Sequence, residues 1–79
     1  MYEFKNELTM SKSGFLFDHS SGQTYTLNPT GKLIFEKMQE GLDDEAILST
    51  LIEEFEVEAH IARRDLEDFI RQLKEMGVI

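Results

Sequence analysis

The chain has 79 residues, no cysteine and a net charge of -8, with sixteen acidic residues against eight basic ones. The length allows one domain, residues 1–79, and the absence of cysteine excludes disulfides and thiolate metal sites. The negative charge disfavours nucleic acids and anionic membranes as partners, and no apolar run approaches the ~20 residues of a membrane span; with no signal peptide either, we expect a cytoplasmic protein.

The first half of the chain predicts a small antiparallel sheet. We expect strands at residues 2–10, 15–17 and 23–27, joined by a turn at residues 11–14 and a hairpin loop at residues 18–22. The first strand shows the alternation of apolar and polar residues that is typical of a half-buried strand, broken only at Asn6. The third is rich in β-branched and aromatic residues and places Tyr25 and Leu27 on one face.

The second half predicts three helices. We expect one at residues 29–40, one that starts at the N-cap Asp43 and carries apolar residues as far as Phe55, and one at residues 59–76. Asn28 is also a preferred N-cap, and Pro29 loses no hydrogen bond at a first helical position. Gly77 suits the left-handed residue that follows a helix, so Val78 is expected to pack back on Leu73.

Apolar residues at helical spacing predict the core. In the first helix Leu33, Ile34 and Met38 are expected to be buried, with Phe35 at the edge. The second helix has its apolar positions at Ile47, Leu48, Leu51, Ile52 and Phe55, and the third is expected to bury Ala62, Leu66, Phe69, Leu73 and Met76. These patterns predict an α+β fold, a small three-stranded antiparallel sheet followed by three helices, with a winged-helix-like architecture.

The sequence contains no arrangement of residues that supports catalysis. A nucleophile needs an activating base and a metal needs convergent ligands, but His19 and His60 are isolated and residues 20–22 have the character of a turn. The acidic residues 43–45 and 53–58 do not have the spacing of a calcium loop and are interpreted as solvated helix faces. We therefore expect no enzyme activity, no metal and no cofactor.

Three helices beside a small sheet also occur in winged-helix DNA-binding regulators, which are one alternative. The third helix would then enter the groove of the DNA. Its arginines are accompanied by four carboxylates, at Asp65, Glu67, Asp68 and Glu75. Phosphates would repel these carboxylates, so the electrostatics oppose this function.

Three short strands must leave at least one edge of the sheet unpaired. A free edge beside a helix is the arrangement that binds a peptide by strand addition, since the edge donates and accepts main-chain hydrogen bonds while the groove reads side chains. The other interpretation is an interaction or structural subunit with no peptide ligand, whose edge is merely exposed.

From Phe15 to Ile79 the chain resembles the PqqD-like family, also called the recognition element for precursors of ribosomally made, modified peptides (RiPPs). The residues that carry the resemblance are, in chain order, Leu27-Asn28, Gly31, Leu33, Ile34, Gly41-Leu42, Ile47, Leu51, Val57, Asp65-Leu66, Phe69-Ile70, Leu73 and Gly77-Val78-Ile79. The order and spacing of these residues together make the resemblance specific. Gly31 stands where Ala is commoner in the family.

The resemblance implies a peptide chaperone without catalytic activity. Members of the family bind the leader segment of a ribosomally made precursor peptide and present it to a modifying enzyme, either a radical SAM maturase or a leader peptidase. Relatives occur as monomers and as dimers, so a monomer or a homodimer is expected here.

The resemblance also suggests the binding residues. The leader would add to the third strand, where the main chain of Thr24, Tyr25 and Thr26 would supply the hydrogen bonds, and would lie against the third helix. One flank of that helix carries Arg63, Glu67, Ile70 and Lys74, and the other carries Ile61, Asp65, Asp68 and Gln72. We favour the first flank, because an exposed Ile70 beside two cations suits an amphipathic, partly acidic peptide.

Overall fold

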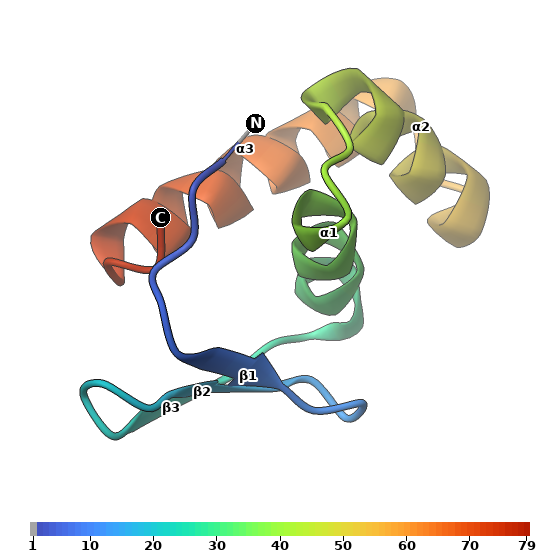
Figure 1. Cartoon of the computed structure of the whole chain (residues 1–79). Coiled ribbons are helices and arrows are strands. Elements are labelled where there is room, and N and C mark those ends of the chain that lie inside the picture. Colours follow the sequence, from blue (N-terminus) through green and yellow to red (C-terminus); the bar gives the residue numbers. More distant parts are fainter. Residues whose placement is uncertain (1) are drawn as a thin grey trace.

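The computed structural model describes residues 2–79, and Met1 of the predicted domain lies outside them. The elements are β1 (Leu8–Met10), β2 (Phe15–Asp18), β3 (Gln23–Thr26), α1 (Pro29–Gln39), α2 (Asp44–Phe55) and α3 (Ala59–Glu75). The strands form one antiparallel sheet in the order β1-β2-β3, and Figure 1 shows all three helices on the same side of it. This arrangement confirms the predicted α+β fold. No helix within residues 2–79 is both long and apolar enough to cross a membrane.

The first strand is much shorter than the sequence predicts. Only Leu8–Met10 pairs with β2, and Glu7 has a φ of 65°, a left-handed conformation that turns the chain away from the sheet. Residues 2–5 run instead beside the end of the chain, where the Lys5 N–H donates to the Val78 carbonyl at 2.7 Å. The Phe4 ring packs edge-on against Phe35, with ring centroids 5.1 Å apart. The apolar residues Tyr2 and Phe4 of this segment therefore pack against the helical core instead of belonging to a strand.

The helix ends follow the local signals in the sequence. The Asn28 and Asp43 side chains accept hydrogen bonds from the N–H groups of Gly31 and Ala46, as N-caps do. At the end of α3 the Val78 N–H donates to the Leu73 carbonyl at 3.0 Å, which is the predicted Schellman closure. These interactions depend only on residues close in sequence, so the sequence is sufficient to predict them.

The core joins one residue of the sheet to the three helices and the C-terminus. Its buried apolar members are Leu16, Ile34, Phe35, Met38, Ile47, Leu48, Leu51, Ala62, Leu66, Phe69, Leu73 and Val78. Two expectations for α1 need correction. Phe35, expected at the edge of the buried face, is completely buried because the Phe4 ring covers it. Leu33, expected to be buried, is only partly so. Met76 and Ile52 are also only partly buried, and Phe55 is exposed at the end of α2.

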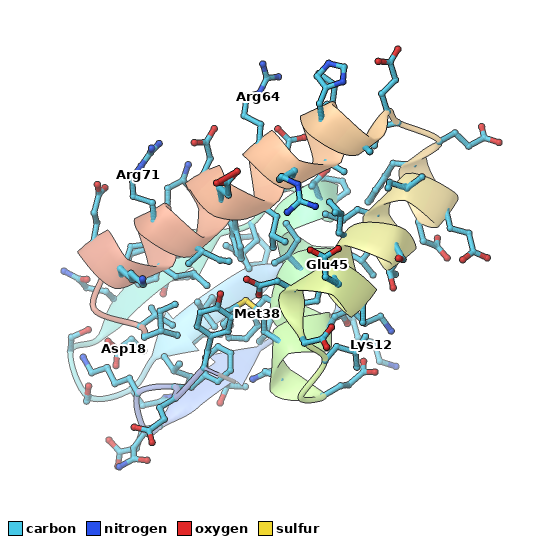
Figure 2. All side chains as sticks on the ribbon, turned by 90° about the horizontal axis from the view of Figure 1, so that it is seen from above. Lys12, Asp18, Met38, Glu45, Arg64 and Arg71 are labelled. Carbon is cyan, nitrogen blue, oxygen red and sulfur yellow. The ribbon has the colours of Figure 1, made fainter. Side chains whose placement is uncertain are left out.

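Within residues 2–79, Asp18 is the one charged residue that is buried. The sequence assigns it to the hairpin loop, but it ends β2, with 2% of its surface exposed. Lys5 Nζ lies 2.8 Å from its carboxylate, and the Ser20 hydroxyl donates to it at 2.7 Å. The Lys5 ammonium and then the Ser20 hydroxyl hold the pKa of Asp18 well below its usual value of 3.8. Asp18 therefore anchors the N-terminal segment to the hairpin (Figure 2).

An Asp18→Asn variant is expected to unfold at a lower temperature than the wild type at pH 7, because it loses the ion pair with Lys5. Since the pKa of Asp18 is lowered by folding, the stabilisation is complete above the usual value of 3.8 and is lost as the pH falls below it. Circular dichroism melts should show a difference of several degrees at pH 7 that shrinks from about pH 4 to about pH 2. A difference that stays constant over this range would contradict the ionic role of Asp18.

Candidate functional site

The pairing register shows which main-chain groups of β3 are free. Gly14 lies opposite Leu27 in the register of β2 and β3, and the Leu27 N–H donates to the Gly14 carbonyl at 2.8 Å. In an antiparallel ladder, hydrogen-bonded and non-hydrogen-bonded pairs alternate. The hydrogen-bonded pairs after Gly14–Leu27 are therefore Leu16–Tyr25 and then Asp18–Gln23.

Thr24 and Thr26 are thus the residues of β3 whose N–H and C=O groups point away from β2. Within residues 2–79 no strand pairs with this outer edge. The expectation for the main chain of Tyr25 needs correction, because the register commits its N–H and C=O to β2. The Tyr25 side chain lies on the helix-facing side, where it is half-buried and its hydroxyl donates to the Gln23 side chain.

A pocket of about 230 Å³ lies where β3 leads into α1, between α1 and α3. Its lining residues are Asn28, Thr30, Gly31, Ile34, Asp65, Asp68, Phe69 and Gln72. Seen from above in Figure 2, α3 runs over the β3 side of the sheet, with β1 on the opposite side. The free edge and this pocket therefore lie on the same side of the molecule.

Gly31 brings α1 close to α3 at the bottom of this pocket. A Cβ atom on Gly31 would lie 2.9 Å from Cε1 of the Phe69 ring, which is too close for an ordinary contact. The absence of a side chain therefore lets the Phe69 ring approach the first turn of α1 closely, and Phe69 is only 9% exposed. Phe69 and the buried Ile34 form an apolar floor below polar walls.

The polar wall on α3 is acidic. Asp65 and Asp68 both line the pocket. Asp68 forms an exposed ion pair with the Arg71 guanidinium, with 3.0 Å between the charged atoms. Asp65 is half-buried and forms no ion pair within residues 2–79. Such a surface favours polar or basic groups of a ligand over acidic ones.

The flank of α3 that the sequence analysis favours lies elsewhere. Glu67, Ile70 and Lys74 line a separate pocket of about 310 Å³ together with Tyr2 and Asp44. The Tyr2 hydroxyl donates to the Asp44 carboxylate at 3.0 Å, and burial together with this contact raises the pKa of Tyr2. Arg63 reaches Glu45 of α2 at 3.4 Å. The structure therefore places these four residues beside the N-terminal segment and α2, and places Asp65, Asp68 and Gln72 at the pocket between α1 and α3 that follows the end of β3.

The sequence analysis did not assign Asn28, Thr30 and Gly31 to the site. Asn28 was identified only as a cap and Gly31 only as an unusual residue in a first helical turn. Gly31 was the signal in the sequence that could have indicated this site. A glycine in a helix costs about 1 kcal/mol relative to Ala and often has a packing reason, here the close approach of the Phe69 ring.

Comparison with known proteins shows the family and the fold of this chain. The pattern of the family described as "Coenzyme PQQ synthesis protein D (PqqD)" matches residues 14–79. The structure "Lasso peptide synthetase B1 complexed with the leader peptide" is 29% identical, with a TM-score of 0.83 over 96% of this chain and 93% of that chain. "TbiB1 in Complex with the TbiA(beta) Leader Peptide" is 22% identical, with a TM-score of 0.84 over 98% and 93%, a likeness that shows the fold alone.

Among curated proteins, no sequence matches this chain. The family match spans every element from β2 to the C-terminus and leaves out β1 and the segment before it. It covers the stretch from Phe15 to Ile79 in which the resemblance was identified. The chain is therefore a member of the PqqD family.

Proposed function

We propose that this protein binds the leader segment of a ribosomally made precursor peptide by strand addition at β3 and presents it to a modifying enzyme, without catalysing a reaction itself. The observation that carries the proposal is the free edge of β3, where Thr24 and Thr26 have outward main-chain groups and from which the chain leads through Asn28 into the pocket between α1 and α3. An added strand forms main-chain hydrogen bonds with such an edge, and its side chains enter the adjoining groove.

The likeness to lasso peptide synthetase B1 supports this function, because that protein was solved with a leader peptide and matches nearly the whole chain. It also favours a leader peptidase over a radical SAM maturase as the enzyme that receives the peptide. We propose that the protein acts in the cytoplasm, where ribosomally made peptides are released, as a monomer or a homodimer. A DNA-binding role has no comparable support, since α3 carries acidic residues along both flanks.

The groove that we propose for the leader is lined by Asp65, Asp68, Phe69 and Gln72 on α3. Every second side chain of an added strand points to the helix-covered face of the sheet. One such side chain would reach the apolar floor at Phe69 and Ile34, below the carboxylate of Asp65. The acidic wall leads us to propose a leader with polar or basic residues at this point.

A Thr24→Pro variant is expected to bind the leader about tenfold more weakly than the wild type, because proline removes an outward N–H and narrows the range of φ. Thr24→Val is the control, since it removes the hydroxyl but keeps the main-chain donor and the preference for strand. Isothermal titration calorimetry measures both affinities, and circular dichroism checks that helical content is retained. Equal affinity of the proline variant and the wild type would exclude strand addition at this residue.

A matched pair of variants distinguishes the two flanks of α3. Asp65→Trp and Glu67→Trp remove the same charge and add the same ring, on opposite flanks of the helix. We expect Asp65→Trp to weaken leader binding at least about tenfold by filling the groove, and Glu67→Trp to change it less than about twofold. Titration of both variants with the leader is the measurement. The reverse order of effects would assign the peptide to the flank that carries Ile70.

A further inference from the structure

The sheet has an outer face that nothing in the described chain covers. Figure 1 shows α1, α2 and α3 on one side of the sheet and none on the other. The pairing register places Thr9, Phe15, Phe17, Thr24 and Thr26 on this outer face. His19, which follows β2, joins them because its ring stacks on Phe17 and hydrogen-bonds to the Thr9 hydroxyl. Each of them is exposed.

The central strand of this face has an unusual polarity. In an antiparallel sheet with one solvated face, apolar residues normally point inward and polar residues outward. In β2 the opposite holds at two neighbouring positions, because the charged Asp18 points inward and Phe17 points outward. Phe15 and Phe17 are 41% and 37% exposed, and their ring centroids are 6.5 Å apart. The ring of Phe17 also stacks on His19, with centroids 6.5 Å apart.

These aromatic rings form a continuous row on a strongly acidic protein. The six outer-face residues include none of the sixteen acidic residues of the chain. Scattered exposed apolar residues are ordinary, but neighbouring exposed aromatics on one face of a sheet are typical of a surface that binds another protein. Aromatic–threonine pairs across the strands also stabilise a sheet, so a test must separate binding from folding.

The outer face is continuous with the edge that would receive the leader. A strand added to β3 sends its side chains alternately to the two faces of the sheet. One set enters the groove below α3, and the other set extends the outer face next to Thr24 and Thr26. A protein that docks on Phe15 and Phe17 would therefore touch the bound leader as well.

We propose that the outer face is the surface on which the peptide-modifying enzyme docks, and that the bound leader completes this surface. The inference rests on the proposed function. The occupant would contribute an apolar surface opposite Phe15 and Phe17. A second copy of this chain fits less well, because two molecules that each carry a net charge of -8 repel each other. Because the enzyme would contact carrier and leader together, each would strengthen the binding of the other.

The test uses a leader peptide that this protein binds and the purified enzyme that modifies the corresponding precursor. Enzyme binding is measured by biolayer interferometry for the wild type, for the double variant Phe15→Thr/Phe17→Thr, and for Phe55→Gln, each with and without saturating leader. Threonine keeps the preference for strand. Phe55 is the matched control, because it is 37% exposed like Phe17 but lies at the end of α2, away from the sheet.

We expect the double variant to bind the enzyme at least about tenfold more weakly, Phe55→Gln to differ less than about twofold from the wild type, and all three proteins to bind the leader equally. The wild type should bind the enzyme more tightly with leader than without it. Equal enzyme affinity of the three proteins would overturn the proposal. So would a wild-type dimer in sedimentation experiments that becomes a monomer in the double variant, because a second copy would then cover the face.

A measurement on the wild type keeps the proposal testable if the double variant does not fold. NMR cross-saturation from the enzyme should reach the ring protons of Phe15 and Phe17 before those of Phe55, and the reverse order would overturn the proposal. Failure of the proposed function gives a different result. In that case the wild type binds no leader peptide at all, whereas failure of the docking surface alone leaves leader binding intact.

Discussion

Leu16 is the buried centre of the contact between the sheet and the helices, and the partly buried Leu8, Met10 and Tyr25 pack around it. It is the only strand residue among the buried apolar side chains of residues 2–79, and all the others lie on helices or at the C-terminus. A sheet of three short strands is not stable on its own and must pack one face on a second layer. Because β2 is central, this contact positions both of its neighbours. Within residues 2–79 no further strand pairs with the outer edge of either one.

A free edge of this length cannot bind a peptide tightly by hydrogen bonds alone. The outward groups of Thr24 and Thr26 offer four hydrogen bonds at most, each worth about 1 kcal/mol net. A micromolar complex needs about 8 kcal/mol, and ordering the peptide adds a further cost. In the proposed complex the remainder would come from side chains, so we assign it to the pocket over Phe69. Strand addition would then provide the register, and the pocket would provide affinity and selectivity.

The differences between expectation and structure have a common cause. Alternation of apolar residues predicted a strand from Tyr2, but the same residues pack on helices, because Glu7 turns the chain and Val78 accepts the Lys5 N–H. Phe35 is buried where the edge of the helical face was expected, since Phe4 covers it. Both contacts join residues far apart in sequence, and the sequence pattern contains no information about such partners.

The sequence by itself determined the element types, the N-caps at Asn28 and Asp43 and the closure after Gly77, because these depend on periodicity and on neighbours within one helical turn. The resemblance to the family also led to the proposal of a peptide site on β3 and α3, which stays a prediction. Only the tertiary structure decided that Thr24 and Thr26, and not Tyr25, have free main-chain groups, and that Asp65 rather than Glu67 faces the groove. Strand register and helix rotation are set by long-range packing, such as the close approach of Gly31 to Phe69.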